Sequence, residues 1–240
     1  MTNTKEIENA TLEAIYWWNR NESYYHNCFV NLDKIYLDKA MLGFFATKIF
    51  DVFLREYSIR RNIKSGHENV NRFLEDLFQH QFIKRVKSGE IELIDTLSDE
   101  LKCKGDYTEN QTKSLLSKLA FLINPNIFSL LDNLAKESLW GELNNAKKIF
   151  TKGKLNSYAF YIERVNELIN KNDIILENQK LILNNFKDTP AYTFFSENPN
   201  AFKRRIIDKY LWIRKQNQNE KSRKIENESY LQFVKLGILE

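Results

Sequence analysis

Glycine and proline are scarce in this sequence, which has 7 glycines and 3 prolines among its 240 residues. Sandwiches and barrels of β-strands need frequent turns rich in both residues, and doubly wound folds need glycines where strands lead into helices. Both classes are therefore disfavoured, and long helices are favoured. No uncharged apolar run reaches the roughly 18 residues that indicate a membrane span. Residues 1–5 also lack the basic start of a secretory signal peptide, so neither element is expected.

Cysteine and histidine are also rare, which limits the metal and redox chemistry that the sequence predicts. Cys28 and Cys103 form no C-x-x-C pair, and so few cysteines favour a reducing, cytoplasmic location. His26, His67 and His80 lack the spacing of metal ligands, so we expect no metal site. The sequence has no glycine-rich phosphate-binding motif either, and we expect no nucleotide or other cofactor.

The remaining composition is that of an ordinary globular protein with a core rich in aromatic rings. Hydrophobic residues make up 42% of the chain, charged residues 28% and aromatic residues 13%. We predict an all-α, multi-helix bundle, because helical spacing of apolar residues dominates throughout. Residues 1–218 are predicted to form a single helical domain, either as one body or as two lobes with a cleft near residues 105–140. Residues 219–240 are predicted to form a polar segment and a short C-terminal helix.

Several segments carry clear helix patterns. Residues 32–61 are apolar all round, which is typical of a helix buried at the centre of a bundle. A further helix is predicted over residues 67–86, whereas residues 92–94 fit a short strand as well as a helix. Residues 108–111 match a capping box, which predicts the start of a helix at about residue 109. Residues 201–216 are strongly amphipathic and predict another helix.

One segment combines residue types that suggest chemistry. Lys118 lies inside an apolar helix pattern, Pro125 then breaks the helix, and Asp132 stands at the start of the next helix. Burial of a lysine favours its neutral, nucleophilic form, and a helix N-terminus favours a negatively charged carboxylate. Such a carboxylate can stabilise the sugar cation that forms when an N-glycosidic bond breaks. The alternatives are a lysine that extends from the helix surface into solvent and an aspartate that only caps its helix.

The same segment resembles a known family through six residues in a fixed order: Ser114, Ser117, Lys118, Pro125, Phe128 and Asp132. This pattern is similar to the core of bacterial proteins related to 8-oxoguanine DNA glycosylase, in the helix–hairpin–helix DNA glycosylase superfamily. Residues 204–212 resemble the final helix of the same proteins. The resemblance implies a two-lobed helical fold, with Lys118 as the Schiff-base lysine and Asp132 as the catalytic aspartate.

Positive charge is concentrated near the C-terminus, which suggests a nucleic-acid partner. Residues 203–224 contain nine lysines and arginines and only two acidic residues, whereas the whole chain has a net charge of +4. A basic stripe of this kind suits the phosphate backbone of double-stranded DNA, although a solvated helix face would have the same composition. The residues predicted to bind nucleic acid are Lys113, Lys203, Arg204, Arg205 and Lys209.

These features predict a DNA glycosylase and abasic-site lyase that acts on a damaged or modified base of double-stranded DNA, without metal, cofactor or membrane. The alternative is a catalytically inactive helical protein that binds DNA or another protein. Residues 110–117 favour this alternative, because they contain no glycine. The superfamily's hairpin usually has glycines just before the lysine, where backbone N–H groups approach a DNA phosphate.

Overall fold

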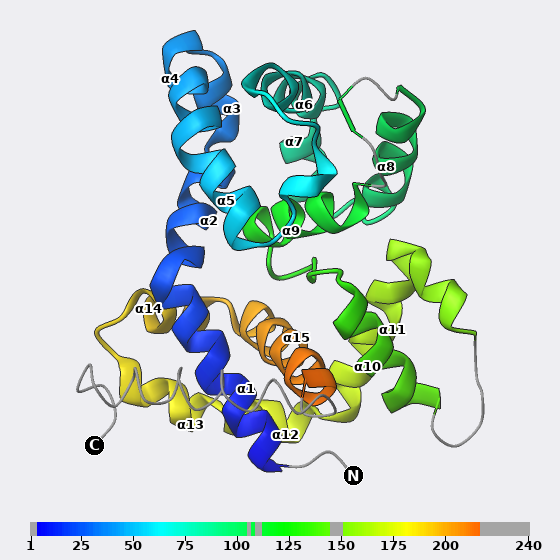
Figure 1. Cartoon of the computed structure of the whole chain (residues 1–240). Coiled ribbons are helices and arrows are strands. Elements are labelled where there is room, and N and C mark those ends of the chain that lie inside the picture. The colour runs from blue at the N-terminus through cyan, green and yellow to red at the C-terminus, as the bar shows by residue number, and fades with distance from the viewer. Residues whose placement is uncertain (1–3, 105–106, 109–111, 145–150, 217–240) are drawn as a thin grey trace. The chain divides into compact units, whose positions relative to one another are not determined.

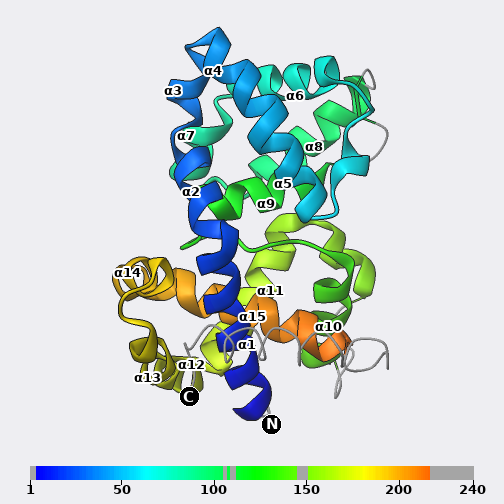
Figure 2. The same ribbon diagram turned by 60° about the vertical axis from the view of Figure 1, so that its left-hand side comes forward.

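The computed structural model of the chain is built of helices, and it describes residues 4–104, 107–108, 112–144 and 151–216 (Figures 1 and 2). No strand occurs among these residues, so the prediction of an all-α fold is confirmed. Backbone contacts divide the chain into a central unit, residues 24–124, and a terminal unit, residues 1–23 with 125–240. The cleft expected near residues 105–140 stays a prediction, and the predicted C-terminal helix at 219–240 lies outside the described residues.

The central unit contains eight α-helices among its described residues, the first of which starts at the boundary between the units. They are α2 (Ser23–Val30), α3 (Leu32–Tyr36), α4 (Lys39–Phe44), α5 (Asp51–Glu56), α6 (His67–Gln79), α7 (Phe82–Lys87), α8 (Leu93–Lys104) and α9 (Lys113–Ile123). A π-helical turn, Phe45–Phe50, joins α4 to α5. Helix α9 packs against α7 and α8, and every side chain from Leu115 to Ile123 is buried.

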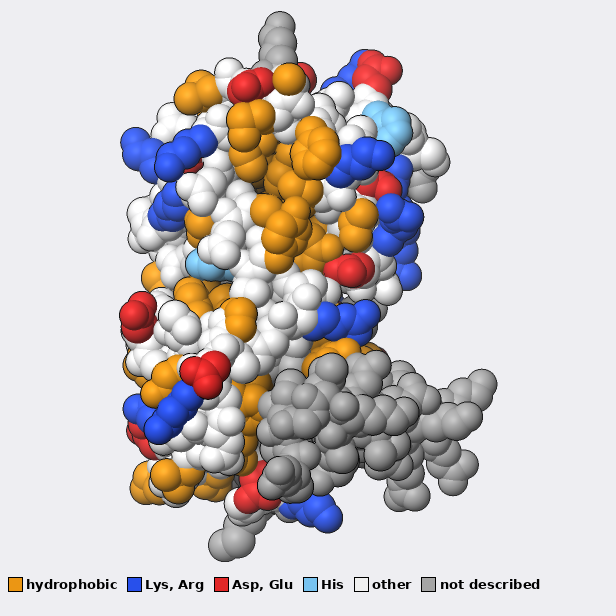
Figure 3. Space-filling model, turned by 90° about the vertical axis from the view of Figure 1, so that its left-hand side faces the viewer, with side chains coloured by type: hydrophobic (Ala, Val, Ile, Leu, Met, Phe, Trp, Pro, Cys, Tyr) orange, Lys and Arg blue, Asp and Glu red, His pale blue; other side chains and the backbone are white. Residues whose placement is uncertain are grey.

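The long helix predicted over residues 32–61 is wrong in two respects. The Asp38 carboxylate accepts hydrogen bonds from the backbone N–H groups two and three residues later, at 2.9 and 3.1 Å, and so caps a new helix there. The chain is therefore broken between α3 and α4. This part of the chain is not buried all round either, since Leu37 is 80% exposed and Phe44 is also exposed. Figure 3 shows hydrophobic side chains gathered on the face that includes α3 and α4.

The helix predicted over residues 67–86 is also broken, into α6 and α7. Gln81 adopts a left-handed conformation, with φ of 49°, between the two helices. Helix α8 begins at Leu93, so the alternative of a short strand at residues 92–94 is wrong. Helix α9 begins at Lys113, later than the capping-box pattern predicted, and residues 109–111 of that pattern lie outside the described residues.

The terminal unit is organised around its last described helix. Its α-helices among the described residues are α1 (Thr4–Trp17), α10 (Asn133–Asn144), α11 (Tyr158–Lys171), α12 (Asp173–Asn178), α13 (Lys180–Leu183), α14 (Pro190–Glu197) and α15 (Pro199–Gln216). Helix α15 packs against both α1 and α10, and Figure 1 shows it between them. The amphipathic helix predicted over residues 201–216 is therefore confirmed, but it lies in the core of this unit.

Neither a membrane-spanning helix nor a cluster of metal ligands occurs among the described residues. None of its helices combines the length and the hydropathy that are needed to cross a membrane. Within the same residues, no group of three or more His, Cys, Asp or Glu side chains is placed to hold a metal ion. Cys28 and Cys103 are both free thiols.

Candidate active site

Lys118 is buried in the middle of α9, with only 6% of its surface exposed. Its neighbours along the helix are apolar and buried as well, so the lysine side chain does not extend into solvent. The Nζ atom donates a hydrogen bond to Ser114 Oγ, one turn earlier, at 2.8 Å. This bond orients the amine toward the start of the helix. The prediction of a lysine enclosed by an apolar helix is thus confirmed.

Asp132 lies directly before α10 and caps this helix, as the sequence predicts. Its Oδ1 atom accepts a hydrogen bond from the backbone N–H of Ala135 at 2.7 Å. The partial positive charge of the helix N-terminus favours a negative charge at this position. This arrangement fixes the orientation of the carboxylate and agrees with both a capping role and a catalytic role.

The irregular segment that leads from Pro125 to Asp132 is held by two tyrosines of α11. The Tyr158 hydroxyl bridges the backbone of Ser129, since it donates to the carbonyl at 2.7 Å and accepts from the N–H at 3.1 Å. The Tyr161 hydroxyl donates to the carbonyl of Leu130 at 3.0 Å. Both hydroxyls are buried, so these bonds satisfy backbone groups that water does not reach. The position of Asp132 is therefore set by the packing of α11.

Arg204 of α15 holds the start of the same segment. Its Nε donates to the carbonyl of Asn126 at 2.8 Å, and its Nη2 donates to Asn166 Oδ1 at 2.6 Å. The Asn126 side chain in turn binds Asn198 at 2.9 Å, and its Oδ1 accepts from the N–H of Ala201. Arg204 thus acts as a clamp on the segment before Asp132, which is a role that the sequence does not reveal.

A buried network of charged side chains lies next to this clamp. Arg205 is 3% exposed, and its guanidinium binds both carboxylate oxygens of Glu22, one of them at 3.0 Å, and also the carboxylate of Asp208. Burial raises the pKa of Asp208 to about 6; Arg205 opposes this shift, and the charge of Asp132 acts in the same direction as burial. The network therefore extends electrostatically to Asp132.

Lys209 belongs to the same network and is enclosed by aromatic rings. Its Nζ atom lies 4.4 Å from the ring centroid of Trp17 and 5.6 Å from that of Trp212. Burial lowers the pKa of Lys209 to about 8, and the nearby guanidinium of Arg205 acts in the same direction. The carboxylates around Lys209, including Glu22, oppose this shift only in part.

The basic stripe predicted over residues 203–224 is not an exposed stripe at residues 203–209, because α15 is a core helix whose charged side chains bind protein groups. Arg205 and Lys209 are buried, and Arg204 binds the segment before α10. Lys203 Nζ pairs with Asp173 at 2.6 Å and Glu177 at 2.5 Å. Residues 217–224 of the stripe lie outside the described residues.

Lys113 is likewise paired within the central unit, with Asp95 Oδ1 at 2.8 Å. The two residues predicted to be catalytic fall in different units, Lys118 in the central unit and Asp132 in the terminal unit. The structure describes the surroundings of each, and their meeting in one cleft stays a prediction.

Sequence reasoning missed Glu22 and Asp208 as members of the charged network. The spacing of three residues between Arg205 and Asp208 was a visible signal, because side chains at this spacing meet on a helix. Glu22 gave no signal, since it is 183 residues away from its partner.

Comparison of the chain with protein-family models, with curated proteins and with solved structures finds no match.

Proposed function

We propose that the chain is a DNA glycosylase with abasic-site lyase activity that acts on a damaged or modified base. The observation that carries the proposal is the amine of Lys118, which is buried in an apolar helix and oriented by Ser114. Burial in an apolar helix favours the neutral, nucleophilic form of a lysine amine, which is the form that attacks a sugar carbon. The fixed carboxylate of Asp132 is the second support.

In the proposed reaction, the target nucleotide leaves the base stack and its sugar reaches the amine of Lys118. The lone pair of the Lys118 amine attacks C1′ of the sugar while the N-glycosidic bond breaks, and the base leaves with the bonding electrons and takes up a proton. Asp132 stabilises the positive charge that develops on the sugar. The bond between C1′ and the ring oxygen then breaks, the ring oxygen takes up the proton that the nitrogen loses, and a Schiff base forms between Lys118 and C1′. In β-elimination a C2′ proton passes to water, and the C3′–O3′ bond breaks as the 3′-phosphate leaves.

Borohydride trapping tests this chemistry, because reduction of the Schiff base links the enzyme covalently to DNA. The intact protein should give a trapped adduct with duplexes that contain damaged bases or abasic sites. Lys118→Met should abolish the adduct, and it preserves most of the apolar contacts of the side chain. Lys84→Met on α7, which removes an exposed lysine of the same unit, is the control and should trap normally.

Normal trapping by Lys118→Met would refute the assignment of the nucleophile. If the intact protein binds duplex DNA in a salt-dependent way but never gives an adduct, the chain is an inactive DNA-binding protein instead. This alternative has its own support, because the segment before Lys118 lacks hairpin glycines. Absence of DNA binding at low salt would leave a helical protein-interaction module.

A further inference from the structure

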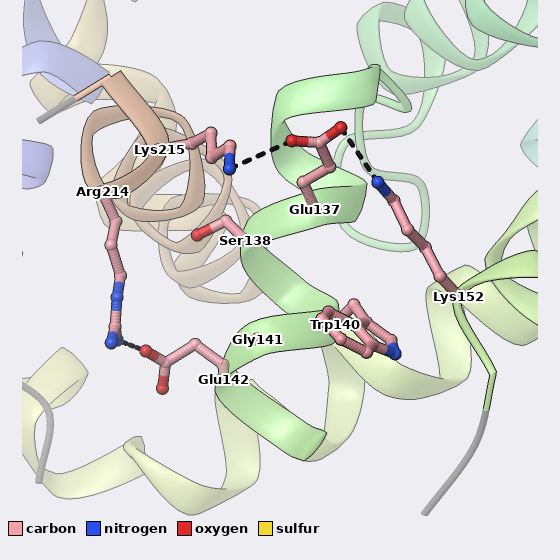
Figure 4. Close-up of a pocket in the computed structure, with 8 residues that line it drawn as sticks. All are labelled: Glu137, Ser138, Trp140, Gly141, Glu142, Lys152, Arg214 and Lys215. Atoms are coloured by element: carbon pink, nitrogen blue, oxygen red, sulfur yellow. Dashed lines mark hydrogen bonds and ion pairs between the residues drawn. The ribbon is translucent and has the colours of Figure 1, made fainter. Parts of the chain in front are cut away.

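A pocket lies in the terminal unit between α10 and the end of α15, away from the segment that positions Asp132 (Figure 4). Its volume is about 220 Å³, and described residues of α10, α15 and the turn at Lys152 line it. A second hollow of about 400 Å³ shares Glu137 and Lys152 with the pocket. The two spaces therefore lie next to each other along α10.

Ser138 is the first sign that this pocket receives a ligand. The residue is 7% exposed, and its hydroxyl has no hydrogen-bond partner among the residues that the structure describes. Figure 4 shows the Oγ atom turned from α10 toward the side of α15. A buried hydroxyl without a partner is unfavourable, so a ligand atom that accepts its hydrogen bond would remove this penalty.

The charged side chains that line the pocket are a second indication that it binds a ligand. Glu137 bridges two lysines, with Lys152 Nζ at 2.9 Å and Lys215 Nζ at 3.1 Å, and Glu142 pairs with Arg214.

Lys136 lines the second hollow and adds another positive charge. Among the described residues that line the two spaces, four are cationic and two are carboxylates, which leaves an excess of two positive charges. A phosphomonoester carries about −1.5 to −2 charges at pH 7 and would balance this excess.

Trp140 gives the pocket an apolar wall. Its ring lines the space and is partly exposed, and Figure 4 shows it beside Lys152. An exposed indole ring next to cationic side chains suits a ligand that carries a flat or apolar group beyond its phosphate. Lysine and arginine would bind the phosphate, and tryptophan would bind the rest of the ligand.

We propose that this pocket binds a terminal phosphate group, that of a nucleotide. Lys152 and Lys215 move from Glu137 to the phosphate oxygens, and the Ser138 hydroxyl donates to one of them. The phosphate belongs either to a free nucleoside 5′-monophosphate or to the 5′-end of a DNA strand. The inference stands whether or not Lys118 acts on DNA, because all of its residues belong to the terminal unit.

Isothermal titration calorimetry on the full chain tests the proposal with adenosine 5′-monophosphate, adenosine and inorganic phosphate. Saturable binding should occur at micromolar to millimolar concentration for the monophosphate, more weakly for phosphate, and not for adenosine. Two oligonucleotides of the same sequence, one with a 5′-phosphate and one with a 5′-hydroxyl, show whether the bound phosphate is that of a DNA end or of a free nucleotide. Tighter binding of the phosphorylated strand than of the free nucleotide assigns the site to a DNA end, and the reverse order assigns it to the free nucleotide.

Two lysines of the terminal unit give a matched pair of variants. The side chains of Lys152 and Lys180 are 53% and 50% exposed, and each pairs with a glutamate, at 2.9 and 2.5 Å. Lys152→Gln should weaken binding roughly tenfold, because a hydrogen bond to a charged group is lost, whereas Lys180→Gln should leave it unchanged. Ser138→Ala should weaken binding severalfold while it preserves the fold.

Equal losses of affinity in Lys152→Gln and Lys180→Gln would overturn the proposal, because they would show that the ligand is attracted to positive charge in general and is not bound by this pocket. Adenosine binding as tight as that of its monophosphate would overturn it as well, and so would the absence of any saturable binding at millimolar monophosphate. Gly141→Phe is an independent check, because a Cβ at Gly141 meets no atom within 4 Å, and a large side chain there should close the pocket.

Discussion

The buried guanidinium of Arg205 permits a sharp test of the terminal unit. Its side chain is 3% exposed and lies between Glu22 and Asp208, which are both buried. Arg205→Met keeps the apolar part of the side chain but leaves two carboxylates without their common partner. Removal of one member of a buried ion pair is strongly destabilising, because the remaining charge stays in a medium that solvates it poorly.

The expected loss is about 3–5 kcal/mol in the free energy of unfolding, the range found when a buried ion pair is broken. For a protein of this size, a loss of that magnitude lowers the Tm by roughly 6–20 °C. Circular dichroism and tryptophan fluorescence during thermal and urea unfolding measure the change. Arg72→Met is the matched control, because Arg72 also pairs with a glutamate, Glu68 at 2.7 Å, but on the surface of α6. Its loss should stay within about 1 kcal/mol.

The effect of Arg205→Met should depend on pH. Without the guanidinium, which opposes the rise in the pKa of Asp208, this buried carboxylate should take up a proton still more readily in the folded than in the unfolded protein. A group with a raised pKa in the folded state stabilises the fold at low pH and loses this contribution as the pH rises. The difference in the free energy of unfolding between the intact protein and Arg205→Met should therefore become smaller as the pH falls toward 4, so long as the intact protein also stays folded there.

Three results would refute this account of the network. The first is that Arg205→Met lowers the free energy of unfolding by less than about 1 kcal/mol, and the second is that it lowers it by no more than Arg72→Met does. The third is that the stability difference between Arg205→Met and the intact protein does not change with pH. The double variant Glu22→Gln with Arg205→Met should recover part of the lost stability, because it removes one of the uncompensated charges. A role of Arg205 in DNA binding alone would instead weaken binding without a loss of stability.

Three further predictions concern stability. Gly43→Ala in α4 should raise the free energy of unfolding in urea by about 0.5–1 kcal/mol, because a Cβ there meets no atom within 4 Å. Gly89→Ala should lower the free energy of unfolding, because Gly89 has φ of 84°, which disfavours residues with a side chain. Tyr158→Phe should reduce the free energy of unfolding by about 1–3 kcal/mol, because the buried backbone of Ser129 loses its partner. A change near zero would contradict the role of Tyr158 in holding Ser129. The raised pKa of Asp208 predicts a contribution to stability that is present below pH 4 and lost as the pH rises through about 6, and Asp208→Asn should flatten this part of the profile.

Local residue chemistry was sufficient to predict much of the helical structure. The scarcity of glycine and proline indicated an all-α chain, Pro125 marked the end of a helix, and Asp132 was identified as the cap of α10. These features depend on neighbours within a few positions, so the sequence displays them directly. The sequence left two positions open for Lys118, burial or extension into solvent, and the packing of α9 against α7 and α8 decided for burial.

Tertiary structure decided which charged residues face the interior. The lysines and arginines of residues 203–209 have the composition of an exposed basic stripe, yet α15 packs against α1 and α10 and carries them into the core. What makes this burial tolerable for Arg205 is Glu22, a partner 183 residues away that only folding brings within reach. The sequence alone determined the helical class and the cap at Asp132, whereas long-range packing determined the solvation of each charge.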